Sequence, residues 1–267
     1  MILGVIRLVI FVADTAVFLV AVLLASLVGS EAKLAYRVAA YWAWLNLRLC
    51  GVRVEVQGRE HLDPARSYVF MSNHCSNLDV LALVVTLWEF QLRWVAKEEL
   101  LRIPGFGWGL RATKQIIINR ADHAQAMASL ARATERLRKG ISVVFFPEGT
   151  RNAGALRPFK KGGFVFAIQT GSPIAPIAIS GTLGILPRGR WLVRRGGRVR
   201  VTVQPPIATE GRSLEDRDAL LSAVTESIGS AIARTPAPTR EATAPRGFAG
   251  RLRVRTSAMP TRSGGRA

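Results

Sequence analysis

The stretch "SYVFMSNHCSNLDVLALVVTLWEF", residues 67–90, places a cluster of polar residues between two apolar segments. Residues 67–72 form a short apolar run that predicts a buried strand, and residues 78–90 are long enough for a helix. His74 lies just past the strand, and Asp79 lies in the first turn of the helix. Polar groups at the carboxyl ends of strands are where α/β proteins usually build their sites. The stretch therefore predicts an α/β fold with a site at this turn.

The alternation of strand and helix patterns continues to about residue 233. Strand patterns occur at residues 93–97, 115–119, 141–146, 174–180 and 198–204, and helix patterns occur at residues 121–140 and 159–171. We predict one domain over residues 51–233, with a mixed central sheet and helices on both faces. A chain of 267 residues is long enough to bury such a core.

The N-terminal segment is strongly apolar. Residues 2–29 contain just two charged residues, Arg7 and Asp14. The run is longer than the apolar region of a cleaved signal peptide, and it exceeds the about 20 residues that cross a bilayer. Aromatic and basic residues then mix over residues 31–49, as is typical of the headgroup region. We expect residues 1–50 to form a membrane anchor, either one span or a helical hairpin in one leaflet. A buried helical pair inside a soluble protein is the alternative.

The charge of the chain is far from balanced. Lys and Arg number 37 against 18 Asp and Glu, which gives a formal charge of +19. This excess predicts an anionic partner, and the apolar N-terminal segment favours membrane lipid over nucleic acid. Basic residues follow that segment, so we expect a location at the cell membrane with the following domain facing the cytoplasm.

The C-terminal segment, residues 234–267, has a different composition. It holds eight arginines, one glutamate and four prolines without apolar periodicity. This composition predicts a disordered basic tail. The tail either holds the protein near anionic lipid or is a solvated segment without function.

His74 and Asp79 are five positions apart, which on one straight helix would separate their side chains by about 140°. A turn between strand and helix instead allows the carboxylate to reach the imidazole, fix its tautomer and stabilise the imidazolium. The free ring nitrogen would then act as a general base on a substrate hydroxyl. The alternative is a capping box in which Ser76 and Asp79 merely close the start of the helix.

Other nucleophiles are not supported. The chain contains no G-x-S-x-G sequence, which argues against a serine hydrolase. Cys75 is the neighbour of His74, but adjacent residues of an extended chain point in opposite directions, so we do not expect a Cys–His pair. The two cysteines, Cys50 and Cys75, have neither disulfide-framework nor metal-site spacing, and no metal is expected.

A second polar cluster, "FFPEGTRN" at residues 145–152, follows another predicted strand. Glu148 and Arg151 project from its loop, and Lys114 and Arg120 bracket the strand predicted before it. Arginine suits bidentate recognition of phosphate. These cations predict a phosphate pocket, and a solvated basic face is the alternative.

Together, "NHCSNLD" and "FPEGTR" resemble the motifs N-H-x-x-x-x-D and F-P-E-G-T-R of the glycerophospholipid acyltransferases. "QIIINR" is similar to the looser second motif, with Asn119 where an acidic residue is common, and "SPIAPIAI" is similar to the fourth. The resemblance covers about residues 50–205 and is strongest to the bacterial 1-acyl-sn-glycerol-3-phosphate acyltransferases.

This resemblance implies a role for each matched residue. His74 would be the general base and Asp79 its orienting partner, while the acceptor headgroup would be held by Arg120, Glu148, Gly149 and Arg151. The acceptor hydroxyl would attack the thioester of acyl-CoA or acyl carrier protein directly, without a further cofactor. The acceptor would be a lysophospholipid, and the product phosphatidic acid. Acylation of another lysolipid, such as lyso-ornithine lipid, and non-catalytic binding of anionic lipid are the alternatives.

Overall fold

The computed structural model describes residues 2–29, 31–119, 122–190 and 196–234. Its strands are β1 (Val52–Gln57), β2 (Val69–Ser72), β3 (Gln91–Lys97), β4 (Ile116–Ile118), β5 (Ile141–Phe145), β6 (Ile174–Ser180) and β7 (Gly197–Val203). They form one seven-stranded sheet in the order β1-β7-β6-β2-β5-β3-β4. Strands β6, β2, β5, β3 and β4 run parallel, whereas β7 is antiparallel to β6 and parallel to β1. The predicted mixed sheet is therefore confirmed.

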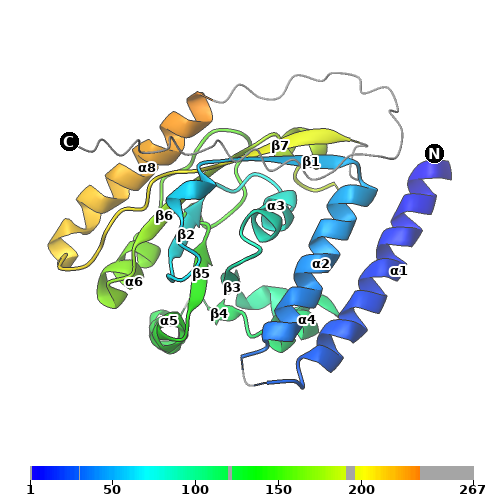
Figure 1. The fold of residues 1–267 in the computed structure, drawn as a ribbon, viewed down its shortest axis with the longest axis horizontal. Coiled ribbons are helices and arrows are strands. Elements are labelled where there is room, and N and C mark those ends of the chain that lie inside the picture. The colour runs from blue at the N-terminus through cyan, green and yellow to red at the C-terminus, as the bar shows by residue number, and fades with distance from the viewer. Residues whose placement is uncertain (1, 30, 120–121, 191–195, 235–267) are drawn as a thin grey trace, which may run out of the picture.

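Helices cover both faces of the sheet (Figure 1). They are α1 (Ile2–Ala25), α2 (Lys33–Leu49), α3 (Leu78–Thr86), α4 (Phe106–Ala112), α5 (His123–Arg138), α6 (Gly162–Thr170), α7 (Thr182–Ile185) and α8 (Arg217–Ala233), with short 3-10 turns η1 (Arg59–His61), η2 (Glu98–Arg102) and η3 (Leu214–Asp216). Helices α2 and α3 pack on one face, and α5, α6 and α8 pack on the other.

Strand β2 shows why the centre of the sheet forms from this sequence. Its residues are all buried, as expected for a parallel strand covered on both faces. Side chains alternate between the faces, so Phe70 packs in the core beneath α2 and α3, whereas Val69 and Met71 pack in the core beneath α5, α6 and α8. The predicted strand thus lies at the centre of the molecule, between β5 and β6.

Strand β1 and helix α8 are among the elements that were not predicted. Strand β1 is an edge strand whose sequence "VRVEVQ" alternates apolar and polar residues, and it pairs with β7 from the far end of the domain. Helix α8 buries Leu220, Val224, Ile228 and Ala231, a spacing typical of a helix with one apolar face. Both patterns are present in the sequence.

The first two helices form a hairpin that is built into the fold. The side-chain amide of Asn46 in α2 donates to the Asp14 carboxylate in α1 at 2.7 Å. The loop between the helices is fixed to β3, because the carbonyl of Glu31 accepts from Gln91 at 3.0 Å and also from Arg93. Among the described residues, no helix is both long and apolar enough to cross a bilayer. Residues 235–267, nearly all of the predicted basic tail, lie outside the described residues.

Candidate active site

The turn between β2 and α3 brings His74 and Asp79 together. The Nδ1 atom of His74 lies 2.8 Å from Oδ2 of Asp79. The Asp79 side chain is fully buried, and that of His74 is 15% exposed. Because a carboxylate can only accept, Nδ1 carries the proton and Nε2 keeps its lone pair. The pair predicted from the sequence therefore has the geometry of an oriented base.

Asp79 also closes the start of α3. Its Oδ2 atom accepts from the backbone N–H groups of Cys75 at 2.7 Å and Ser76 at 2.8 Å. The Ser76 hydroxyl in turn accepts from the N–H of Leu78 at 3.2 Å, whereas the N–H of Asp79 donates to the Ser76 carbonyl, so only the carboxylate half of a capping box is formed. The capping interpretation and the acid–base interpretation are thus compatible, since one carboxylate oxygen makes both sets of contacts.

The residues around His74 are tied to neighbouring strands. The Asn73 side chain pairs with both peptide groups of Ile179 in β6, donating to its carbonyl at 2.9 Å and accepting from its N–H at 2.8 Å. The Ser76 hydroxyl donates to the carbonyl of Leu186 at 2.7 Å. The motif that carries His74 therefore also supplies the side chains that attach this turn to β6 and to Leu186.

On its other side, the His74 ring stacks on an aromatic side chain. The ring centroids of His74 and Phe146 are 3.9 Å apart, and the planes are within 11° of each other. Phe146 stacks in turn on Trp94 of β3, at 5.6 Å and 28°. An aromatic face fixes the plane of the imidazole and favours a positive charge on it. Trp94 was not singled out from the sequence, because only the pairing of β3 with β5 places it here.

Glu148, in the loop after β5, is buried and bonded within the protein. Its carboxylate accepts from the N–H of His74 at 2.7 Å and from the N–H of Arg157 at 2.9 Å. It also accepts from the side-chain amide of Asn152, with distances of 2.9 Å to Oε1 and 2.7 Å to Oε2. Gly149 has φ 73°, a conformation that favours glycine and shapes the turn. That Glu148 and Gly149 hold the acceptor headgroup stays a prediction.

The predicted cations are placed at different ends of the sheet. Arg151 lies at the turn, with Nη1 3.1 Å from Oδ1 of Asn77, the residue that precedes α3. Arg120 lies outside the described residues. Lys114 precedes β4, which runs parallel to β3, so it lies at the amino-terminal ends of these strands, where its charge acts on Glu31. The expectation that Lys114 contributes to a phosphate pocket is wrong, because His74 and Arg151 lie past the carboxyl ends of the parallel strands β2 and β5.

Cys75 is poorly suited to be a nucleophile. Its sulfur donates to Oδ1 of Asn152 at 3.0 Å. Burial, and secondarily the charge of Asp79, raises the pKa of the thiol to about 11, so the thiol stays protonated at neutral pH. Within the described residues, no group of three or more His, Cys, Asp or Glu side chains is arranged to hold a metal ion.

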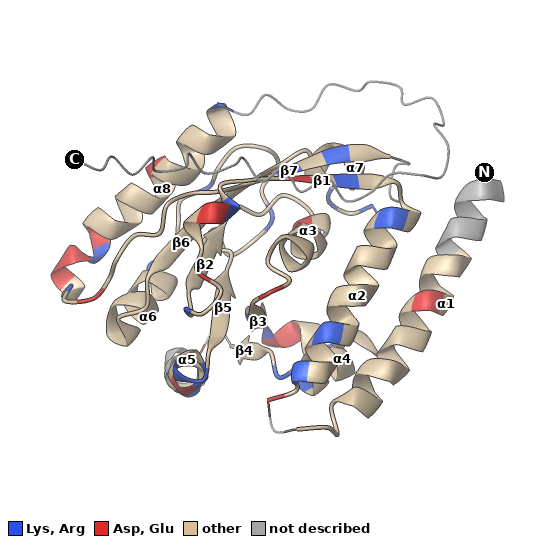
Figure 2. Cartoon of the chain, viewed as in Figure 1, with Lys and Arg blue, Asp and Glu red and all other residues tan. Residues whose placement is uncertain are grey.

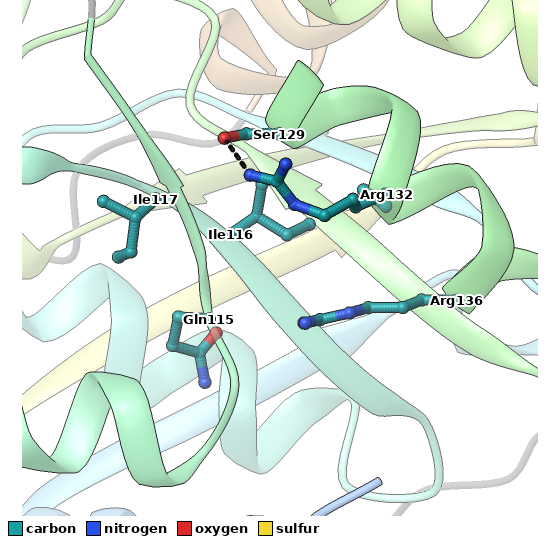
Figure 3. A pocket seen from close by; sticks show the side chains of 7 residues that line it. Gln115, Ile116, Ile117, Ser129, Arg132 and Arg136 are labelled. Carbon is teal, nitrogen blue, oxygen red and sulfur yellow. Dashed lines mark hydrogen bonds between the residues drawn. The ribbon is translucent and has the colours of Figure 1, made fainter. Parts of the chain in front are cut away.

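A separate cavity of about 150 Å³ lies between α5 and β4 (Figure 3). Arg132 and Arg136 of α5 and Gln115 beside β4 are among its lining residues. Strands β5 and β3 separate β4 from β2 in the sheet. The cavity therefore does not belong to the site around His74.

Comparison with known proteins places the chain in a family. A family model described as Acyltransferase matches residues 53–180, which include both the His74 turn and the Glu148 loop. An uncharacterized acyltransferase of Schizosaccharomyces pombe is 33% identical over 217 residues, covering 80% of this chain and 77% of that protein. The chain belongs to the acyltransferase family.

Other members of the family that resemble the chain have more specific names. A chloroplastic 1-acyl-sn-glycerol-3-phosphate acyltransferase of Brassica napus is 36% identical over 172 residues, which are 64% of this chain and 49% of the relative. The 1-acyl-sn-glycerol-3-phosphate acyltransferase alpha of Mus musculus is 36% identical over 182 residues, which are 67% and 64%. The chain thus spans about half to two thirds of the length of these relatives.

A solved structure shares the fold along nearly its whole length. It is the crystal structure of the 1-acyl-sn-glycerophosphate (LPA) acyltransferase PlsC from Thermotoga maritima, with a TM-score of 0.70 and 26% sequence identity. The match covers 87% of this chain and 96% of that one. The mixed α/β architecture is therefore common to both proteins.

Proposed function

We propose that this protein is an O-acyltransferase that moves a fatty acyl chain from a thioester to the free hydroxyl of 1-acyl-sn-glycerol-3-phosphate. The product would be phosphatidic acid, an intermediate of phospholipid biosynthesis. The observation that carries the proposal is the 2.8 Å contact between His74 and a fully buried Asp79, with Arg151 at the same turn. The names of the plant and mouse relatives and of the Thermotoga maritima structure support the choice of acceptor.

In this mechanism the nucleophile is the acceptor's own hydroxyl. Nε2 of His74 removes the hydroxyl proton as the oxygen attacks the thioester carbonyl carbon. The imidazolium that forms is stabilised by Asp79 through Nδ1–H and by the face of Phe146. When the tetrahedral intermediate collapses, the C–S bond breaks and the departing thiolate takes the proton from Nε2. No acyl-enzyme forms, in keeping with the protonated thiol of Cys75.

The acceptor phosphate would bind to arginine. Arg151 is half-buried and lies against Asn77, beside the turn that carries His74. A guanidinium at this place offers paired donors to a phosphate close to the base. Arg120 is proposed as a second phosphate ligand on the sequence motif alone. Glu148 and Gly149 would complete this region by shaping the loop from which Arg151 projects.

We also propose that the α1–α2 hairpin attaches the enzyme to one leaflet of the cell membrane, with the domain of residues 51–233 facing the cytoplasm. The outer surface of α1 carries exposed apolar side chains, at positions 9–12, 17, 20 and 24. Figure 2 shows that the coloured charge on the described side chains of α1 is acidic. This residue, Asp14, accepts a hydrogen bond from Asn46 of α2. Helix α4 packs against α1 near Leu19 and exposes Phe106 and Trp108. Such a surface suits the boundary between headgroups and acyl chains.

The proposal extends to the remaining parts of the chain and to the acyl donor. Residues 1–50 would serve as the anchor, and residues 234–267 as a basic tail that contacts anionic lipid. The donor would be acyl-CoA or acyl carrier protein, with no further cofactor and no metal. Nucleic acid would not be a partner.

The test is an acyl-transfer assay on purified protein in detergent. Labelled acyl-CoA and acyl carrier protein are offered with lysophosphatidic acid, other lysophospholipids, lyso-ornithine lipid and glycerol-3-phosphate. The proposal predicts label in phosphatidic acid, with the highest kcat/KM for lysophosphatidic acid. A higher kcat/KM for another lysolipid would assign that acceptor instead. Absence of transfer to every acceptor by folded protein would indicate a non-catalytic lipid-binding protein.

A further inference from the structure

Asn152, one position beyond the "FPEGTR" motif, holds the peptide of His74 from both sides. Its own N–H donates to the carbonyl of His74 at 2.7 Å. Its side-chain amide donates to Glu148, whose Oε1 accepts from the N–H of His74 at 2.7 Å. His74, Asn152 and Glu148 therefore form a closed ring of hydrogen bonds, in which the backbone of the base is bound at both its donor and its acceptor.

The orientation of the Asn152 side chain is fixed by its neighbours. Oδ1 accepts from the N–H of Gly154 at 2.8 Å and from the sulfur of Cys75 at 3.0 Å. Because a backbone N–H can only donate, the oxygen must face Gly154 and the NH₂ group must face Glu148. An amide meets both requirements. A carboxylate at position 152 would place its second oxygen against the carboxylate of Glu148.

The ring lies in the interior of the protein. Asn152 and Glu148 are each 3% exposed, and Asp79 on the other side of His74 is fully buried. Hydrogen bonds in such an environment are strengthened, and a member that loses its partner has no water to replace it. The same loop carries Phe146, on which the His74 ring is stacked. The closed ring of hydrogen bonds therefore sets the distance between the imidazole and the loop that carries Arg151.

We propose that Asn152 is a positioning residue for His74: it keeps the base in register with the Glu148 loop and with Asp79, without touching the substrate. This inference rests on the proposed function, because positioning affects turnover only if His74 is the base. Substrate binding does not involve Asn152, so its loss should lower kcat and leave KM nearly unchanged. A misplacement of about 1 Å can cost about 100-fold in rate, so a loss of about 10- to 100-fold is expected.

The test compares Asn152→Ala, Asn152→Ser and Asn152→Asp with the wild-type protein in detergent. Asn152→Ala should lower kcat by about 10- to 100-fold with KM for both substrates changed less than about threefold. Asn152→Ser, which regains one donor toward Glu148, should recover part of this loss. Thermal unfolding shows whether each variant is folded.

Asn152→Asp provides a readout that a general loss of stability would not change. Its carboxylate and that of Glu148 can share one proton, so the variant's kcat relative to wild type should rise as the pH falls from about 8 to about 6. The other titratable or charged residues bonded to this pair are Cys75, whose sulfur donates to Asn152, and His74 and Arg157, whose backbone N–H groups donate to Glu148. They are present in both proteins, and the ratio therefore isolates the new pair.

Asn46→Asp is the matched control. Asn46 is also 3% exposed and donates to a carboxylate, that of Asp14, at 2.7 Å; its other side-chain bond is to the carbonyl of Trp42, and neither partner belongs to the His74 turn. Its kcat ratio to wild type should not depend on pH. A folded Asn152→Ala with wild-type kcat, or an Asn152→Asp ratio as independent of pH as that of the control, would overturn the inference. An inactive wild-type protein would instead refute the proposed function.

Discussion

Replacing Asp79 by asparagine removes one charge from the site while changing its shape little. Three donors converge on Oδ2 of Asp79: the Nδ1–H of His74 and the backbone N–H groups of Cys75 and Ser76. An asparagine must turn its oxygen toward the two backbone donors, because its NH₂ group would oppose them. The His74 tautomer is then retained, and the variant loses the negative charge beside the imidazolium.

The size of the effect follows from this contact. A hydrogen bond to a charged group is stronger than one to a neutral group by about 1–1.5 kcal/mol, which corresponds to about 5- to 10-fold in rate. Two unit charges about 4 Å apart interact by about 4 kcal/mol at the effective dielectric constant of about 20 found in proteins, which corresponds to about 1,000-fold. We therefore expect kcat of Asp79→Asn to fall by about 10- to 1,000-fold, with little change in thermal stability.

The measurement is kcat for acyl transfer to lysophosphatidic acid, together with the unfolding temperature. Asp218→Asn, at an exposed aspartate of α8 that pairs with Lys161, is a control for which no change in kcat is expected. A folded Asp79→Asn with kcat within about twofold of wild type would show that Asp79 serves α3 alone. A loss of kcat above about 10,000-fold would show instead that the His74 proton has moved from Nδ1 to Nε2. That result would contradict the expectation that the asparagine oxygen faces the two backbone N–H groups and His74.

Arg151→Ala should raise KM for a phosphate-bearing acceptor by about 10- to 100-fold and KM for the acyl donor by much less, because a charge-assisted contact is worth about 1.5–3 kcal/mol. Equal changes for both substrates would mean that Arg151 supports the loop rather than the acceptor. In a Cys50→Ser background, a thiol reagent at about pH 8 should leave Cys75 unlabelled in the folded protein, since burial and the charge of Asp79 raise the pKa of its thiol to about 11. The raised pKa also means that the protonated Cys75 thiol contributes to the free energy of unfolding below about pH 9, and that this contribution is lost as the pH rises toward about 11. Rapid labelling of Cys75 at about pH 8 would contradict the raised pKa and therefore both the labelling and the stability predictions. Replacing Phe106 and Trp108 together by serine should weaken sedimentation with anionic liposomes by at least about 10-fold, because each buried large apolar side chain contributes about 1.5–3 kcal/mol. Unchanged sedimentation would exclude α4 from the membrane surface.

The parts of the site that depend on local sequence were predictable. The apolar run of β2, the polar turn and the apolar start of α3 are contiguous, so the position of His74 and Asp79 at the carboxyl end of a strand followed from the pattern. The double use of Asp79 was anticipated as two competing interpretations, and the structure combines them in one oxygen atom.

The parts that depend on strand pairing were not predictable. Glu148 and Asn152 meet the His74 peptide because β5 lies beside β2, a pairing between segments about 70 residues apart in the chain. Trp94 reaches Phe146 for the same reason, since β3 lies next to β5. Lys114 was assigned to the wrong end of the strands because the direction of β4 in the sheet does not follow from the local sequence.

The most direct test of the proposed mechanism is the rate of acyl transfer by His74→Ala. Single-turnover transfer from labelled acyl-CoA to lysophosphatidic acid should fall by about 100- to 10,000-fold, because no second base contacts Asp79 among the described residues. The unfolding temperature and sedimentation with liposomes should stay near their wild-type values, since His74 lies at the turn and not on the α1–α4 surface. A folded His74→Ala protein that transfers the acyl chain at the wild-type rate would contradict the assignment of His74 as the base.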